Sequence, residues 1–297
     1  MRIENSFVEK LIQDKNPFPL LWNFMTSEIW KNQEDLGAFY GQEKKMKEFE
    51  LFLHRTFNEI YTELLPKYCM GKGYKIKLKH PIIFLDSLSV REGVLLQEKL
   101  AENGANCKLT YSFSATPSDT KYYKEKIDFN DLKGSEKYGE IKDIESWEID
   151  GGEKIIWSDF PDALLESLSK GKTILSTVTE TYSKVEKLIL RALEQLNYDK
   201  IEIMSDHGYV RHQGAYTFSM DKNDQKKVRK VLKGRRQVPA SETGEIPKGM
   251  KKFLVEYNNF YMAKGRYVWP VSGKYSKLQH GGISLIECMT PRLIIER

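Results

Sequence analysis

The chain has 297 residues, of which 40% are hydrophobic and 30% charged, and its formal net charge is +5. This length and apolar content suffice for one large domain, or for one domain with an appendage, with a sizeable core. The chain has 47 basic and 42 acidic residues. This excess of positive charge is too small for a nucleic-acid-binding signature and favours anionic ligands only weakly.

Membrane insertion and secretion are not expected. The apolar stretches are too short and too interrupted to span a bilayer. Residues 1–16 lack the apolar block of a secretion signal. Cys69, Cys107 and Cys288 lie far apart and are odd in number, so they predict neither a disulfide framework nor a zinc-spaced cluster. We therefore expect a cytoplasmic protein with reduced thiols and no membrane partner.

The N-terminal part is predicted to be helical. Residues 42–65 carry apolar side chains at three- and four-residue steps, which is typical of an amphipathic helix. The segment before it is rich in aromatic residues such as Trp22 and Trp30. We expect a helical N-terminal lobe over residues 1–75.

Strands alternate with helices in the remainder, and this predicts an α/β fold with a largely parallel central sheet and helices on both faces. Two charged stretches, 121–153 and 221–250, look like excursions from this pattern. The predicted strands are 81–86, 107–113, 172–178 and 201–205, and the predicted helices are 90–104, stopped by Gly104, and 183–197.

Polar residues stand where these strands end. Asp86 closes one strand, Thr120 follows the next, Asp206 and His207 close a third, and His280 precedes two glycines. In open α/β sheets, ligands bind at the carboxyl ends of strands. Carboxylate and imidazole groups suit zinc or manganese, and a hydroxyl beside such an ion becomes a good nucleophile.

Each residue also has a structural interpretation. Asp86 could cap the following helix, Thr120 could be a turn or capping residue, Asp206 with Gly208 could form a turn, and His280 could be a loop residue. The order of the whole set along the chain favours a metal site over coincidence.

Four stretches that carry these residues resemble the PglZ-domain branch of the alkaline phosphatase superfamily. They read IIFLDSLSVREG, ATPSDTKYY, IEIMSDHGY and MAKGRYVWPVSGKYSKLQHGGISLIECMTPRLII. The last is the most specific, because an AKGR strand, a gap, HGGISL and a final strand with proline recur in that family. The resemblance covers roughly residues 76–297, and the N-terminal lobe has no counterpart in it.

The resemblance implies an alkaline-phosphatase-like catalytic domain over residues 76–297 that hydrolyses phosphate esters through a phospho-threonine. By this resemblance, Asp86, Asp206 and His207 would bind one divalent metal, zinc or alternatively manganese. That metal would also hold the nucleophile Thr120. His280 would belong to a second metal position.

The other ligands of the second position are normally an aspartate and, four residues later, a histidine, both after an intervening strand. Here the predicted strand 172–178 is followed by Glu180 and Lys184, which occupy this spacing. Glutamate can replace aspartate, but a charged lysine is no ordinary ligand. Either Lys184 is a solvated helix residue, or its ammonium replaces the second metal and neutralises the leaving oxygen. The expected number of ions is therefore one or two.

Members of this family occur in phage-defence systems and response regulators, and those characterised hydrolyse phosphodiesters. The resemblance therefore implies a metal-dependent phosphodiesterase that acts on nucleotide or oligonucleotide esters. One alternative is a degenerate PglZ-like module in defence or signalling that binds a nucleotide or a protein partner without turnover, favoured by Glu180 and Lys184. Another is a nucleic-acid adaptor that uses the basic run from Lys226 to Arg236, although such a run is more often a solvated helix face.

Overall fold

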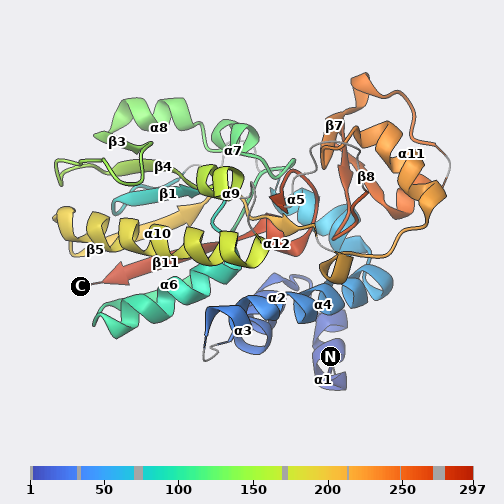
Figure 1. The fold of residues 1–297 in the computed structure, drawn as a ribbon, viewed down its shortest axis with the longest axis horizontal. Coiled ribbons are helices and arrows are strands. Elements are labelled where there is room, and N and C mark those ends of the chain that lie inside the picture. The colour runs from blue at the N-terminus through green and yellow to red at the C-terminus, as the bar shows by residue number, and fades with distance from the viewer. Residues whose placement is uncertain are drawn as a thin grey trace.

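A six-stranded sheet with helices on both faces forms the centre of the computed structural model (Figure 1). The structure describes residues 3–31, 35–69, 76–168, 173–212, 214–247, 249–269 and 278–296. Among the described helices, none is long and apolar enough to cross a lipid bilayer.

The strands of this sheet follow the order β2-β11-β5-β1-β4-β3. β1 pairs in parallel with β5 and β4, and β4 with β3, whereas β11 runs antiparallel to both of its neighbours. The predicted α/β class and largely parallel sheet are therefore confirmed, with β11 as the antiparallel member. The strands are β1 (Ile82–Asp86), β2 (Asn106–Phe113), β3 (Tyr138–Ile141), β4 (Ile155–Pro161), β5 (Lys200–Ser205) and β11 (Met289–Glu296).

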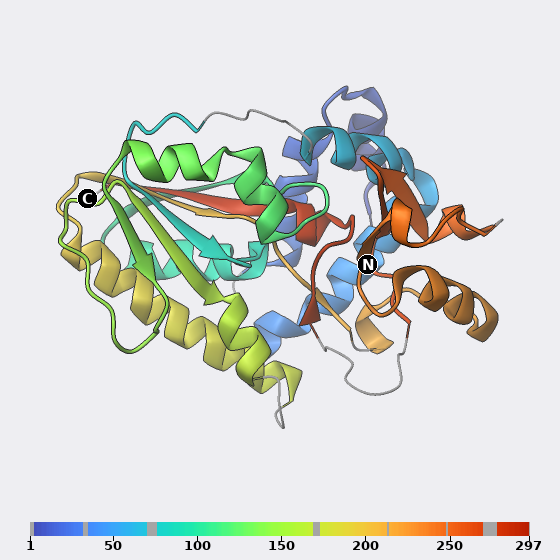
Figure 2. The ribbon, with the colours of Figure 1, turned by 90° about the horizontal axis from the view of Figure 1, so that it is seen from above.

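Different helices bury the two faces of the sheet, because successive side chains of a strand point in opposite directions. Ile83 and Leu85 of β1 join a cluster with α6 and α10, whereas Ile82 and Phe84 join a cluster with α7 and α8. In Figure 2 the green α7 and α8 lie on one side of the strands and the yellow α10 on the other. The helices are α6 (Val90–Glu102), α7 (Thr120–Lys126), α8 (Phe129–Ser135), α9 (Asp162–Leu168) and α10 (Ile174–Gln195).

The prediction of a strand at 172–178 is wrong. From residue 174 onward this segment is the start of helix α10, with Thr173 as its N-cap, and residue 172 lies outside the described residues. The apolar run is short, so its local pattern is compatible with a strand or a helix. It forms a helix because Val178, Tyr182 and Val185 lie in the core at helical spacing. The parallel strand that the sequence did not predict is β4, which begins directly after the predicted excursion at 121–153.

The amphipathic helix predicted over residues 42–65 is divided. Helix α4 (Glu43–Thr56) ends at Phe57, where the backbone leaves the helical region, and a π-helical turn at Ile60–Leu64 leads into α5 (Leu65–Cys69). No glycine or proline stands at residues 57–59 to signal the break.

The N-terminal helices bury their aromatic side chains against the rest of the chain. Trp22 packs on Tyr111 of β2 with ring centroids 5.5 Å apart. The same cluster contains Tyr209, which follows β5, and helix α12 (Leu285–Cys288). The remaining helices of this region are α1 (Asn5–Gln13), α2 (Phe18–Phe24), which continues into a π-helical turn (Met25–Ile29), and α3 (Leu36–Gly41).

A small β unit, at the right of Figure 1, lies between β5 and β11 in the chain. It contains a three-stranded antiparallel sheet of order β7-β9-β8 and helix α11, which packs Val228 and Leu232 against it. The predicted excursion at 221–250 thus contains ordered elements. They are α11 (Lys222–Leu232) and β7 (Gln237–Pro239). The strands β8 (Leu254–Tyr257) and β9 (Phe260–Ala263) come after this stretch, and β6 (Val210–Arg211) and β10 (Leu278–Gln279) form a separate pair.

A buried cluster of charges joins α4 to α6 and to the loop after β9. The Glu43 carboxylate accepts hydrogen bonds from Arg91, at 2.7 and 2.8 Å, and from Arg266, which also contacts Glu50. All four side chains are buried. Burial alone would raise the pKa of Glu43, but the charges of Arg91 and Arg266 outweigh it and hold this pKa well below its usual range.

Removal of one charge from this cluster should destabilise the protein strongly, because it leaves buried guanidinium charge uncompensated. We expect Glu43→Gln to lower the free energy of unfolding by about 3–5 kcal/mol, measured by chemical denaturation. The matched control is Glu145→Gln, which removes an exposed ion pair with Lys184 and should change stability little. Equal effects of the two variants would contradict this role for the cluster.

Candidate metal centre

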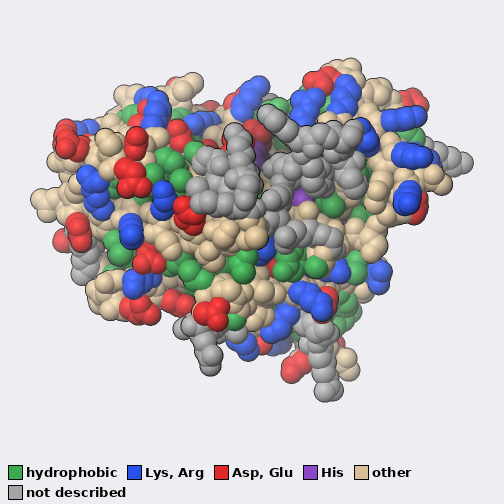
Figure 3. Space-filling model, viewed as in Figure 1, with side chains coloured by type: hydrophobic (Ala, Val, Ile, Leu, Met, Phe, Trp, Pro, Cys, Tyr) green, Lys and Arg blue, Asp and Glu red, His purple; other side chains and the backbone are tan. Residues whose placement is uncertain are grey.

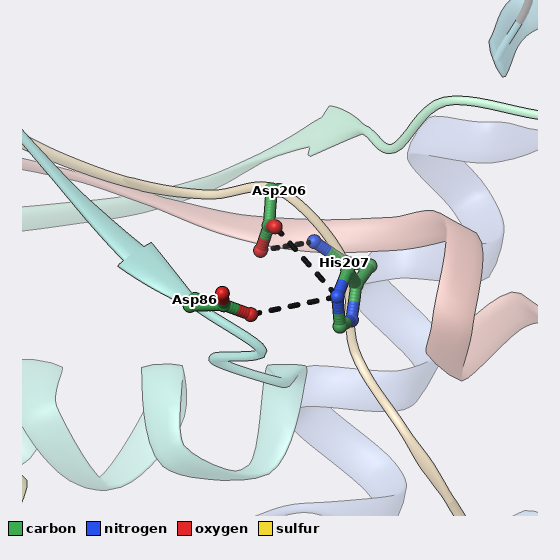
Figure 4. A group of neighbouring side chains, drawn as sticks. All are labelled: Asp86, Asp206 and His207. Atoms are coloured by element: carbon green, nitrogen blue, oxygen red, sulfur yellow. Dashed lines mark hydrogen bonds and ion pairs between the residues drawn. The ribbon is translucent and has the colours of Figure 1, made fainter. Parts of the chain in front are cut away.

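Two adjacent parallel strands place Asp86 and Asp206 side by side. Leu85 of β1 pairs with Ser205 of β5, so the next residue of each strand lies at the same edge of the sheet. Figure 4 shows both carboxylates and the His207 ring turned toward one another. Among the described residues, this is the one group of three metal-ligating side chains whose donor atoms all lie within 4.8 Å of one another.

Thr120 completes the cluster from α7. Its Oγ1 lies 2.6 Å from Asp206 Oδ2, 3.2 Å from both oxygens of Asp86 and 3.2 Å from His207 Nε2. The structure thus brings together four of the side chains singled out in the sequence. The capping interpretations are wrong, because the side chain of Ser89 caps α6 and that of Asp119 caps α7.

The His207 ring is oriented to present a lone pair to this cluster. Its Nδ1 lies 3.1 Å from the carbonyl oxygen of Gly208, and this contact favours the tautomer with the proton on Nδ1. Nε2 then faces Asp86 Oδ1 at 3.5 Å and Asp206 Oδ2 at 3.6 Å. Burial, followed by repulsion from His280, lowers the pKa of His207 to about 3. The ring is therefore neutral near pH 7, as a metal ligand must be.

The two carboxylates fit a cation. Burial, followed by the charge of Asp206, raises the pKa of Asp86 to about 10, and burial also raises the pKa of Asp206. Asp206 Oδ1 accepts hydrogen bonds from the backbone nitrogens of Ser87 and His207, which fixes the carboxylate in place. Two acidic oxygen donors, a hydroxyl and a neutral imidazole are a donor set for a divalent ion such as zinc or manganese.

The backbone around these residues is tightly constrained. A Cβ at Gly208 would lie 2.1 Å from the carbonyl oxygen of Ile286, so only glycine fits after His207. Ser87, directly after Asp86, has a φ of 69°, in the left-handed region that non-glycine residues rarely adopt. Strain of this kind is common at functional sites, where the surroundings must hold it.

His280 lies on the outer side of this group. Its ring stacks on His207 with centroids 4.0 Å apart, and its Nδ1 lies 3.2 Å from the carbonyl oxygen of Ser118. Ser118 Oγ also donates to Gly282 O at 2.8 Å and accepts from Gly281 N at 3.0 Å. The loop before Thr120 and the loop after β10 are therefore joined.

Glu180 and Lys184 do not follow a strand, so the basis for their predicted roles fails. Both lie within helix α10, and Lys184 Nζ lies 3.5 Å from Glu145 in a partly exposed ion pair. The strand with the required position is β4, whose Pro161 pairs with Asp86. The first residue after β4 is Asp162, and four residues later stands Glu166.

Sequence reasoning missed Asp162 and Glu166. The available signal was the apolar run at 155–157 followed by two aspartates, the same strand-then-aspartate pattern that marks Asp86. Burial raises the pKa of Asp162, whereas the charges of His280 and His207 act to lower it, so these side chains lie close to one another.

A cavity of about 240 Å³ opens beside the centre. The segments that follow β2, β4 and β10 contribute Asp119, Asp162, Glu166 and His280 to its lining. The connection from α11 to β7 contributes Gly234, Arg235, Arg236 and Gln237, and β10 contributes Leu278 and Gln279. The cavity therefore lies where the main sheet meets the small β unit.

Comparison with known proteins identifies the family. Residues 149–295, which include Asp206, His207 and His280, match the model of the BREX system PglZ alkaline phosphatase-like domain. No curated protein matches the sequence.

Among solved structures, the murine ectonucleotide pyrophosphatase/phosphodiesterase 5 is similar, as an inactive variant in complex with AMP (TM-score 0.33) and in a second structure (TM-score 0.30). Both are 10% identical, with 58% and 57% of this chain covered. The aligned parts span 63% and 62% of the murine protein, less than two thirds, and a likeness this distant says nothing about function. The family match and the strand-end site agree: residues 149–295 of this chain form a PglZ alkaline phosphatase-like domain.

Proposed function

We propose that this protein is a divalent-metal-dependent phosphoesterase that cleaves phosphodiesters with Thr120 as the nucleophile. The observation that carries the proposal is the position of the Thr120 hydroxyl, within 3.2 Å of Asp86, Asp206 and His207. A hydroxyl with a half-buried carboxylate, a buried carboxylate and a buried imidazole is poor core material. It is a suitable arrangement for nucleophilic catalysis near a cation.

Asp86, Asp206, His207 and Thr120 would hold the first ion, for which zinc suits the mixed nitrogen and oxygen donors. When bound, such an ion neutralises the carboxylates and the charge that develops on the phosphoryl oxygens. Asp162, Glu166 and His280 would hold a second ion. Their common position around one cavity supports this assignment, which replaces the Glu180 and Lys184 prediction.

The chain's own residues account for the proton and bond changes. Thr120 Oγ1 attacks phosphorus while its proton passes to Asp206 Oδ2, which is 2.6 Å away. The Oγ1–P bond forms as the ester bond on the opposite side of phosphorus breaks, and the departing oxygen takes a proton from solvent. Water then attacks the phosphothreonine, so that the Oγ1–P bond breaks, a phosphate monoester leaves and the Thr120 hydroxyl is restored.

The cavity beside the centre supports a diester as substrate, because the second ester group of a diester needs space that a monoester does not. The degenerate-module alternative has lost its main argument, since Glu180 and Lys184 do not stand at the strand end. The domain family supports the same choice at the level of a phosphoesterase-type fold.

Loss of the nucleophile should abolish turnover. Thr120→Ala should lower kcat on bis-(p-nitrophenyl) phosphate, with added zinc or manganese, by roughly 10³-fold or more, because no other hydroxyl replaces it. Thr120→Ser keeps a hydroxyl and should retain part of the rate. Circular dichroism controls for the fold. A full rate for Thr120→Ala would mean that a water molecule, not Thr120, is the attacking group.

Loss of a first-ion ligand should lower metal content and activity together. We expect Asp206→Ala to weaken metal binding by more than about 100-fold, measured by elemental analysis after dialysis against limiting zinc. Asp199→Ala, an exposed residue just before β5 at the opposite end of that strand, serves as the matched control and should bind as the parent does. Unchanged metal content in Asp206→Ala would refute this ligand assignment.

The second ion position has two assignments, one with Asp162 as a ligand and one with Lys184 in place of the ion, and they predict opposite results. Asp162→Ala should reduce the number of tightly bound ions per chain from two to one, because it removes a half-buried carboxylate from the cavity lining. Lys184→Ala should leave both the ion count and turnover unchanged, because Lys184 pairs with Glu145 at the surface. Elemental analysis together with the diesterase assay separates them, and loss of activity in Lys184→Ala alone would restore the earlier hypothesis.

A further inference from the structure

The cavity beside the proposed metal centre is small. Its volume of about 240 Å³ is below the range of about 300–1,000 Å³ typical of sites for drug-sized ligands. The lining that comes from the small β unit and from β10 contains two arginines and two glutamines. These residues lie beyond the proposed metal ligands, so they face the part of a substrate that does not react.

The two arginines differ in what they can do. Arg236 is buried and fully used, because Nε and Nη2 donate to Glu287 at 2.7 and 2.8 Å, and the guanidinium also reaches the carbonyl oxygens of Gly265 and Tyr267. Arg235 is exposed, and its described partner is Glu242 at 3.1 Å, also at the surface. An exposed pair of this kind is weak, so the Arg235 guanidinium is available to an incoming anion.

Gln237 adds an unused acceptor to the same lining. Among the described residues, nothing donates a hydrogen bond to its buried Oε1 atom. Such an atom costs free energy unless a donor reaches it, and a hydroxyl or amine of a bound ester group is one such donor. The side chain of Gln279 does not supply it, because its Nε2 donates to the carbonyl oxygen of Gly234 at 3.3 Å.

Positive charge also surrounds the approach to Arg235. Figure 3 shows Lys and Arg side chains gathered over α11, at the right of the view. On this helix Lys226 and Lys230 are exposed, and Lys233 follows its last turn, two residues before Arg235. An extended anion would be attracted along this path, whereas an uncharged ester group would gain little from it.

We propose that Arg235 and Gln237 form a recognition subsite for a nucleotide-type ester group that carries a second phosphate. Arg235 binds the second phosphate through charge-assisted hydrogen bonds, and Gln237 Oε1 accepts a hydrogen bond from the sugar or base. The inference rests on the proposed function and narrows it, because it makes oligonucleotide-like diesters better substrates than diesters with a single phosphate.

The test compares three thymidine dinucleotides. One has no terminal phosphate, and the other two carry a terminal phosphate at one end or at the other. For the parent protein we expect kcat/KM to be about tenfold or more higher for one phosphorylated form, mainly through KM. Arg235→Ala should reduce this ratio to about one, and Arg235→Lys should restore part of it. Lys187→Ala, which removes an exposed charge of α10 outside the cavity lining, should keep the ratio. Gln237→Leu should raise KM for all of these dinucleotides, with and without the terminal phosphate.

Direct binding separates this inference from the proposed function. The phosphorylated dinucleotide is titrated by calorimetry into Thr120→Ala protein and into the Thr120→Ala, Arg235→Ala double variant. If no diester is hydrolysed but binding depends on Arg235, the proposed function fails and the subsite stands. If diesters are hydrolysed with no preference for a terminal phosphate, or if Lys187→Ala lowers the preference as much as Arg235→Ala, the subsite is refuted and the proposed function stands.

Discussion

Two carboxylates, the half-buried Asp86 and the buried Asp206, lie beside the same hydroxyl, and the architecture around them depends on this contact. Neither is paired with an arginine or lysine in the described structure, and burial raises the pKa of both. Placing like charges together away from water is costly unless protons or a cation neutralise them. A divalent ion would remove this cost at neutral pH, so the pair of carboxylates that would destabilise the fold without an ion would be the basis of the proposed metal centre.

The loop that carries His207 is held in place from the N-terminal helices. Arg91 donates to the carbonyl oxygen of Tyr209, two residues after His207, and the Tyr209 hydroxyl donates to Glu92 at 2.7 Å. The Tyr40 hydroxyl of α3 donates to the same glutamate at 3.0 Å. Arg91 is in turn held by Glu43 of α4. The buried ion network therefore reaches the proposed metal centre through a short chain of hydrogen bonds, and the N-terminal helices support the site as well as the core.

A second buried pair sets the other border of the site. Glu287 of α12 accepts from Arg236 and from the backbone nitrogen of Gly282, and its own carbonyl oxygen accepts from Gly208. One residue thus fixes the glycine loop after His280 and the glycine after His207. A Cβ at Gly282 would lie 2.6 Å from Arg236 Nη2, so both glycines are needed for this close packing. The cavity lies beside this junction, where a strand-end loop and the small β unit meet.

Local pattern in the sequence was enough to predict the α/β class and the helix starting at Val90, and to single out Asp86, Thr120, Asp206 and His207, which the structure brings together. Apolar runs that end in aspartate signal both β1 and β5, and periodicity over a dozen residues signals α6. These features are encoded within a few residues, so they are readable without the fold.

Tertiary structure alone decided which of the short apolar runs are strands and which strand ends are neighbours. Residues 174–178 became helix and Ile155–Pro161 became β4, because one run continues the buried face of a long helix and the other pairs with β1. The position of Asp162 beside His280, and of Lys184 against Glu145, follows from that pairing. Strand pairing joins residues far apart in the chain, and no local pattern states which partner a strand will take.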